Sequence, residues 1–132
     1  MGKIVQDKDM LVEIPENRRR YFGGEGLMLL PGRDSVEAAL RAIASGHIRT
    51  TANIGRELAS AAGAQGTCPM TLRRVLRDIV REDAANIPWW RAVCAGGAMF
   101  ASAPGGREEQ ARRLKAEGVS VCGQGKDLRA TD

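Results

Sequence analysis

Residues 69–81 read PMTLRRVLRDIVR, a pattern with two different faces when it is wound as a helix. Apolar residues recur three and four positions apart, which predicts one buried face of an α-helix, with Pro69 in its first turn. The opposite face carries Arg73, Arg74, Arg77 and Arg81. This face is either a stripe of guanidinium groups open to a polyanion or an ordinary solvated face that Asp78 and Glu82 partly neutralise.

Two shorter helices are predicted before this basic helix. Asp34 and Glu37 have the spacing of a capping box, and apolar residues then repeat with a helical period to about residue 43. A second helix is predicted to begin at the pair Thr50-Thr51, either of which can cap it, and to stop at Gly63. Two short helices followed by a basic one are typical of a helix-turn-helix.

The pattern changes again after the basic helix. Residues 89–94 and 98–100 are predicted to form two short strands around a turn at 95–97, a hairpin that would be the wing of the domain. A closing helix is predicted from about Arg107 to Glu117, with a left-handed stop at Gly118. The predicted fold class is therefore mainly α: a winged helix-turn-helix with a small β-hairpin wing and a closing C-terminal helix.

The two ends of the chain have a different composition from its middle. Residues 1–32 contain Arg18-Arg19-Arg20 and a glycine-rich stretch at 23–26, and we expect them to form an irregular basic N-terminal arm. No strand is predicted before those glycines, which argues against a phosphate-binding loop. We expect residues 33–122 to form the winged domain and residues 123–132 to be a frayed polar tail.

Composition narrows the class of partner. The 132 residues carry a net charge of +4, and sixteen of the twenty basic residues are arginine, whose planar fork suits phosphate and guanine edges. Three cysteines without a CxxC pair favour reduced thiols in a cytoplasm, and a single histidine, His47, gives no reason to expect a metal or other cofactor. No apolar stretch approaches the ~20 residues that cross a bilayer, so we expect neither a membrane partner nor export.

Several short motifs together resemble a known family. They are SGHIRTT at 45–51, the helix with Arg73 and Val75, PWWRAV at 88–93, the glycine pair at 105–106 and AEG at 116–118. This order is similar to that in the DNA-binding domain of the alkylguanine-DNA alkyltransferases, and more closely to that in their alkyltransferase-like relatives. The resemblance covers residues 34–119.

The resemblance implies binding without chemistry. In the alkyltransferases the segment reads Pro-Cys-His-Arg-Val, and its cysteine accepts the alkyl group from guanine with the help of the histidine and a distant glutamate. Here the three positions hold Trp89, Trp90 and Ala111. Indole has no nucleophilic sulfur, so alkyl transfer cannot occur at Trp89. The alkyltransferase-like proteins also carry tryptophan there, and they mark alkylated guanine for excision repair.

The family also implies a set of site residues. The basic helix would lie in the minor groove, and Arg73 would enter the duplex in place of a flipped base. The expected DNA-binding residues are Arg49, Thr50, Thr51, Arg73, Arg74 and Arg77. The expected base pocket consists of Pro88, Trp89, Trp90 and Arg91 together with the segment 97–102, in which Ala98 and Ser102 are singled out. Thr51 and Leu76 stand where the family has a tyrosine and a glycine. The implied partners are double-stranded DNA and an excision-repair protein, bound by a monomer that is cytoplasmic and associates with the nucleoid on DNA.

Three other functions are compatible with the residues. The protein could bind DNA in general, without preference for a lesion. It could be a protein-interaction module that uses residues 18–22 and the tryptophans, because arginine and tryptophan dominate interface hot spots. It could also be an enzyme in which Cys68 or Cys94 is a displaced alkyl acceptor, since both lie next to family motifs.

Overall fold

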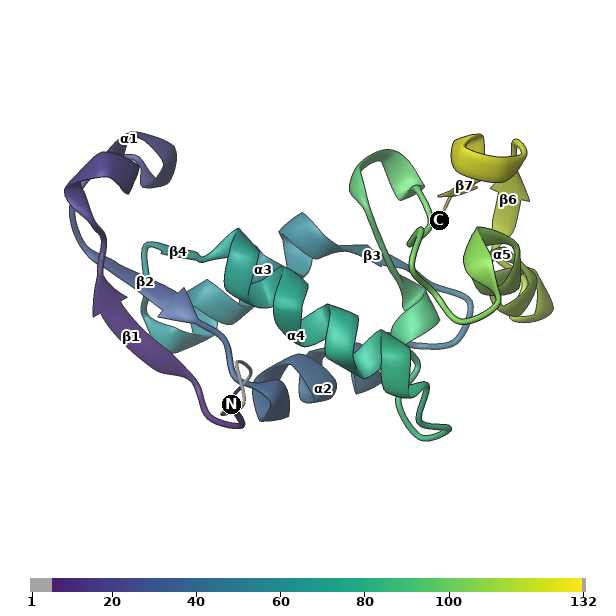
Figure 1. Cartoon of the computed structure of the whole chain (residues 1–132), viewed down its shortest axis with the longest axis horizontal. Coiled ribbons are helices and arrows are strands. Elements are labelled where there is room, and N and C mark those ends of the chain that lie inside the picture. The colour runs from purple at the N-terminus through teal and green to yellow at the C-terminus, as the bar shows by residue number, and fades with distance from the viewer. Residues whose placement is uncertain (1–5, 132) are drawn as a thin grey trace.

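A computed structural model describes residues 6–131, and its elements follow one another as shown in Figure 1. The helices are α1 (Arg19–Phe22), α2 (Arg33–Arg41), α3 (Thr51–Ala62), α4 (Pro69–Glu82) and α5 (Gly106–Ala116). The strands are β1 (Met10–Glu13), β2 (Leu27–Leu30), β3 (Arg49–Thr50), β4 (Gly66–Thr67), β5 (Ala92–Val93), β6 (Ser120–Cys122) and β7 (Arg129–Thr131). Short 3-10 turns lie at Glu16–Arg18, Trp89–Arg91, Ala95–Gly97 and Gly125–Asp127. None of the helices described is long and apolar enough to cross a membrane.

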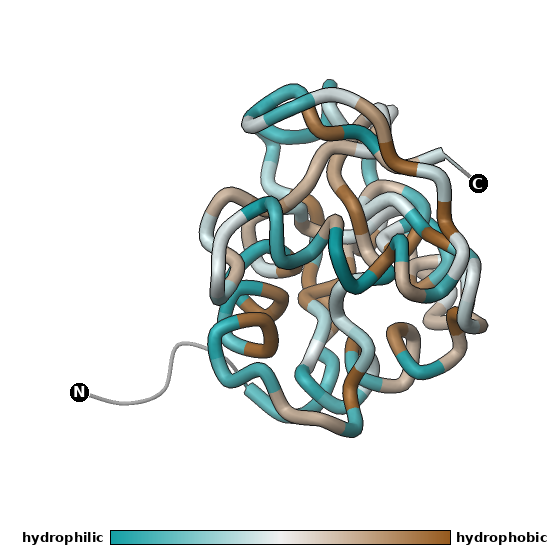
Figure 2. The backbone as a smooth tube through the Cα atoms, turned by 90° about the vertical axis from the view of Figure 1, so that its right-hand side faces the viewer, coloured by the Kyte–Doolittle hydropathy of each residue, from teal (hydrophilic) through white to brown (hydrophobic). Residues whose placement is uncertain are grey.

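The main core lies where α2, α3 and α4 meet. Leu40, Ile54 and Val75 are almost completely buried there, one from each helix. Hydrophobic residues alternate with hydrophilic ones along the tube of Figure 2, as expected for elements with one buried face. α2, α3 and α4 therefore lie where the apolar spacing predicted helices, and α5 lies where a closing helix was expected, whereas α1 was not predicted.

Helix ends were predicted with mixed success. Thr50 caps α3 as expected, because its side chain accepts a hydrogen bond of 3.1 Å from the amide of Asn53. The predicted capping box of α2 is wrong: its N-cap is Gly32, and no side chain caps it. The backbone of Lys8 lies directly against the N-cap and leaves no room for a side chain there, since a Cβ on Gly32 would lie 2.3 Å from the carbonyl carbon of Lys8. Glu37 instead pairs with Arg33 at 2.6 Å.

The predicted hairpin at 89–100 does not form. Residues Trp89–Arg91 make a 3-10 turn, and β5 pairs in parallel with β3 rather than with residues 98–100. Ala92 and Val93 are fully buried, so their position is fixed by the core and by β3 rather than by a local turn. Ala98 forms a bridge with Arg129 in β7.

The segment expected to be irregular contains two strands. β1 and β2 pair antiparallel, and β2 continues in parallel to β4, which gives a three-stranded sheet with β2 in the middle. Ile14, Met28 and Leu29 are buried in or beside this sheet. The expectation of an irregular arm is therefore wrong for residues 10–13 and 27–30, and its first five residues lie outside the described part of the chain.

The C-terminal segment is also ordered. Gly118 has φ +89°, and the amide of Val119 donates to the carbonyl of Leu114 at 3.0 Å, which is the left-handed stop that the sequence predicted. β6 and β7 then form an antiparallel pair, and Leu128 and Ala130 are buried in a second core with Leu114. The expectation of a frayed tail is wrong because its apolar residues complete that core.

Candidate nucleic-acid interface

A cleft of about 550 Å³ runs along the exposed side of α4. One wall comes from α3 and the other from the segment 94–102, so the cleft lies between elements that are far apart in sequence. Its apolar surface includes Leu72, Leu76, Val80 and Phe100. Its polar groups include Tyr21, Thr51, Thr67 and Ser102, and its charged groups are Arg56, Arg73 and Arg77. The volume lies in the range of small-molecule sites in proteins.

The arginines of α4 are open to solvent. Arg73, Arg74, Arg77 and Arg81 are exposed. Within residues 6–131, no ion pair joins any of them to a carboxylate. Glu82 does not neutralise the stripe, because both of its oxygens accept hydrogen bonds from Arg33, at 2.6 and 2.8 Å. The first reading of this face, a stripe of free guanidinium groups, is therefore the one that the structure supports.

The position of α4 is fixed at both ends. Its N-terminal half packs on α3, where the Thr67 hydroxyl just before α4 donates to the carbonyl of Gly55 at 2.6 Å. The helix ends at its C-cap residue Asp83, whose φ is +49°. The Asp83 carboxylate accepts two hydrogen bonds from Arg113, at 2.7 and 3.0 Å, which tie the end of α4 to α5. The arginine stripe is thus carried by a rigid helix.

Trp89 belongs to the core rather than to the cleft. It is fully buried, and its indole Nε1 donates to Asp83 at 2.7 Å. Arg113 lies over the rings of both Trp89 and Trp90, with its guanidinium carbon 5.1 and 5.3 Å from their centroids. Hydrogen bonds from Arg113 and from Trp89 lower the pKa of Asp83 to about 2. Trp89 is therefore part of a charged, hydrogen-bonded support that joins the end of α4 to α5. Its ring meets that of Trp90 edge to face, with 6.0 Å between the centroids.

The expected base pocket is divided in the structure. Ser102 lines the cleft, whereas Pro88, Trp90 and Arg91 line a second hollow of about 340 Å³ together with Arg41, Ala85 and Asn86. Arg91 is held there by two hydrogen bonds to Glu117, at 3.0 and 2.7 Å. Ala98, at its bridge with β7, lines neither hollow.

The expected DNA-binding residues lie closer together. Thr51, Arg73 and Arg77 line the cleft, and Arg74 is exposed beside them on α4. Thr50 caps α3 at the edge of this face. Arg49 precedes it in β3 and makes an ion pair of 3.2 Å with Glu57.

The cysteines differ in their surroundings. Cys94 lines the cleft, but burial raises the pKa of its thiol, even though Arg107 and Arg73 act in the opposite direction. Burial also disfavours the thiolate of Cys68, yet hydrogen bonds from Thr71 and Arg18 outweigh it and lower the pKa. Cys68 is only 4% exposed and lines neither hollow. Neither thiol therefore combines access with activation. The described residues contain no cluster of side chains that could hold a metal ion.

The sequence did not assign Tyr21 or Arg56 to the site, whereas Phe100 lies in the segment 97–102 that was expected in the base pocket. Tyr21 comes from the β1–β2 connection, Arg56 from the exposed side of α3, and Phe100 from the segment expected to form the wing. The run Arg18-Arg19-Arg20-Tyr21-Phe22 was a visible signal for the first of these. Arg56 could be assigned to the cleft only from the packing of α3 beside α4, which no local pattern encodes.

No protein-family model matches the chain, and a search of curated protein sequences found no match. A solved structure that is similar is the crystal structure of S. pombe Atl1 in complex with damaged DNA containing O6-carboxymethylguanine. The chain shares the fold of Atl1. The two are 22% identical in sequence with a TM-score of 0.52, over 75% of this chain and 85% of that chain. The Atl1 fold confirms, at the level of architecture, the resemblance that the sequence motifs indicated.

Proposed function

We propose that this protein binds double-stranded DNA without chemistry and recognises alkylated guanine, as a signal for repair. The observation that carries the proposal is the free guanidinium stripe of α4 beside a cleft with an apolar floor. Guanidinium groups attract the phosphate backbone, while an apolar hollow of this size suits a base taken out of the stack. The Atl1 fold supports the proposal, since that protein was crystallised with damaged DNA.

In this proposal the cleft receives the flipped base. Arg73 lies at the middle of the cleft, where it would fill the space that the base leaves in the duplex. Phe100 offers a ring for stacking, which is worth ~1 to 3 kcal/mol per base and offsets the few kcal/mol that unstacking costs. The Thr51 hydroxyl would hydrogen-bond a phosphate next to the lesion. Trp90 and Arg91 lie in the second hollow, outside this path.

The proposal includes no transfer of the alkyl group. The residue at the acceptor position, Trp89, is buried and hydrogen-bonded to Asp83. The one cysteine among the residues that line the cleft, Cys94, has a raised pKa and hence little thiolate at neutral pH. A lesion bound without repair stays in place, which suits a protein that recruits an excision-repair partner.

The test compares affinity for a plain duplex with affinity for the same duplex carrying one O6-alkylguanine, at several salt concentrations. We expect tighter binding to the lesion and a steep fall in affinity with salt. Arg73→Ala should weaken binding to the lesion duplex by roughly 10- to 100-fold, an effect of ~1 to 3 kcal/mol. Arg112→Ala is the matched control, because Arg112 is exposed on α5 and paired with Glu109.

Two outcomes would contradict the proposal. If Arg73→Ala and the double variant Arg73→Ala/Arg77→Ala bind as tightly as the unchanged protein, the stripe is not the DNA-binding face. If the intact mass of the protein rises by one alkyl group after incubation with the lesion duplex, a thiol has accepted the group and the protein is an enzyme. Peptide mapping would then show whether Cys94 or Cys68 carries it.

A further inference from the structure

The connection between β1 and β2, residues 14–26, forms a projecting arm that carries α1 at its tip (Figure 1). Phe22 fixes the arm to β4. Its ring lies directly over Gly66, where a Cβ would be 2.7 Å from a ring carbon. Arg18 contacts both Phe22 and Cys68. Its guanidinium carbon lies 5.5 Å from the centroid of the Phe22 ring, and its Nη1 donates a hydrogen bond to the Cys68 sulfur at 3.4 Å. The tip therefore has a defined position on the body of the protein.

The residues next to Phe22 are turned to solvent. Tyr21 is 68% exposed, the largest exposure among the exposed large hydrophobic side chains of the described chain. It meets the Phe22 ring edge to face, at 4.9 Å between centroids and 79° between planes. Arg20 is also exposed, and within residues 6–131 no carboxylate forms an ion pair with it. A rigid arm thus presents a bare aromatic ring beside an unpaired cation.

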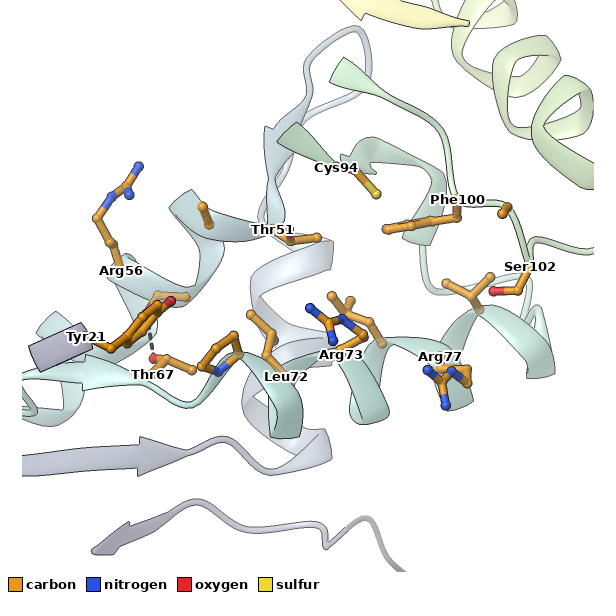
Figure 3. Close-up of a pocket in the computed structure, with 16 residues that line it drawn as sticks. Tyr21, Thr51, Arg56, Thr67, Leu72, Arg73, Arg77, Cys94, Phe100 and Ser102 are labelled. Carbon is orange, nitrogen blue, oxygen red and sulfur yellow. Dashed lines mark hydrogen bonds between the residues drawn. The ribbon is translucent and has the colours of Figure 1, made fainter. Parts of the chain in front are cut away.

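Tyr21 extends the arginine face, and Arg20 precedes it on α1. Tyr21 lines the same cleft as Arg73 and lies at its end near Arg56, with Phe100 at the other end (Figure 3). In Figure 1, α1 lies beyond the N-terminal end of α4. A duplex seated along α4 would meet Arg56 and then the arm as it leaves the cleft. The positive charges of the arginines along this line are complementary to a continuous polyanion such as DNA.

We propose that the arm is a second DNA contact, in which Arg20 binds a phosphate and Tyr21 packs against the sugar or base beside it, outside the base pairs that α4 covers. This inference rests on the proposed function and adds a site to it. Each base pair adds about 3.4 Å of duplex, so the arm can act only on DNA long enough to reach past α4. The arm then adds affinity on duplexes that extend past α4.

The test uses two duplexes with the same central O6-alkylguanine, one of about 8 base pairs and one of about 20. Arg20→Ala/Tyr21→Ala should weaken binding to the long duplex about 10-fold and reduce the slope of log affinity against log salt by about 1, because one phosphate contact is lost. Binding to the short duplex should not change. Tyr21→Phe should retain the affinity, since the ring remains. Lys126→Ala is the control, a side chain exposed near the C-terminus.

A chemical readout locates the contact. Tyr21 is the single tyrosine of the chain, so nitration of tyrosine reports on this position alone. We expect the long duplex to protect Tyr21 from nitration and the short duplex to leave it reactive. Peptide mapping would separate this product from any oxidation at the cysteines.

The outcomes separate the two proposals. If the unchanged protein binds neither duplex, the proposed function fails, and the arm proposal falls with it. If the unchanged protein binds the lesion but the double variant binds the long duplex equally well, the arm proposal alone is overturned. Equal weakening on both duplexes also overturns it, as does a nitration rate that DNA does not change. In those cases the arm would instead be tested for binding to an acidic protein.

Discussion

At the scale of single residues, Asp83 joins several parts of the molecule. Its left-handed backbone conformation ends α4. Its carboxylate accepts hydrogen bonds from Arg113 of α5, and one of the two oxygens also accepts a hydrogen bond from the Trp89 indole. Arg113 in turn donates to Glu109 at 2.7 Å. The pKa of Asp83 near 2 means that the ionised form is the one that the fold stabilises.

Replacing Asp83 with asparagine should remove the charge and one of the two oxygens that accept hydrogen bonds from Arg113. Asparagine tolerates the left-handed conformation and retains an oxygen acceptor for Trp89. We expect Asp83→Asn to lower the free energy of unfolding at pH 7 by about 1 to 3 kcal/mol, the worth of hydrogen bonds to a charged group. Because the folded pKa is depressed, this stabilisation is present above about pH 4 and is lost as the pH falls through about 2.

Urea unfolding between pH 2 and pH 7 measures this effect. The gap between the unchanged protein and Asp83→Asn should narrow steadily below pH 4. Asp78→Asn is the control, as Asp78 lies on the same helix and no ion pair joins it to another described residue. A gap that stays constant to pH 2 would show that the charge of Asp83 does not contribute.

At the scale of elements, helices could be predicted from the sequence and most strands could not. The apolar spacing of α4 and the stop at Gly118 are local signals, so α4 and the end of α5 lie where they were expected. β3 and β5 have two residues each, and their pairing depends on contacts between residues about 43 positions apart. The alternation of apolar and polar residues that marks a strand cannot be recognised over two residues. The arm strands likewise need β4 to complete their sheet.

The turn Ala95–Gly97 offers a test of how the cleft wall is held. Gly96 and Gly97 both have positive φ, so alanine at either position costs about 1 kcal/mol in backbone strain. At Gly97 a Cβ would also lie 2.1 Å from the carbonyl oxygen of Ala130 in β7, whereas at Gly96 it would meet nothing within 4 Å. We expect Gly97→Ala to cost a further ~1 to 3 kcal/mol as this turn is pushed off β7.

Thermal unfolding of the two variants measures this difference in stability. Gly97→Ala should melt several degrees below Gly96→Ala, which serves as its control for backbone strain. Equal melting temperatures would mean that the turn does not depend on its contact with β7.

At the scale of the whole molecule, the candidate site was predicted in part. Thr51, Arg73 and Arg77 could be identified because they lie on or beside helices with clear patterns. Phe100 lies in the segment 97–102 that was expected in the base pocket, whereas only the folded chain brings Tyr21 and the arm to the other end of the same cleft. Burial of Trp89 was equally hidden, because a tryptophan in the sequence is compatible with a pocket or with a core.

The C-terminal segment provides a test at the same scale. Deletion of residues 123–132 should remove the partner strand of β6 and the buried side chains of Leu128 and Ala130. We expect the free energy of unfolding to fall by at least about 2 kcal/mol, given the apolar surface of Leu128 alone. Lys126→Ala, within the same segment, should have no measurable effect in the same urea titration. An unchanged midpoint for the deletion would mean that the segment is dispensable for folding.

The burial of Trp89 also bears on how such a protein could evolve. A cysteine at this position would open a void in the core and leave the Asp83 oxygen without its indole donor. Truncations of a buried tryptophan cost roughly 3 to 5 kcal/mol, a large share of the 5 to 15 kcal/mol that keeps a typical domain folded. A single codon change from Trp89 to cysteine would therefore be selected against through misfolding, whatever the reactivity of the new thiol.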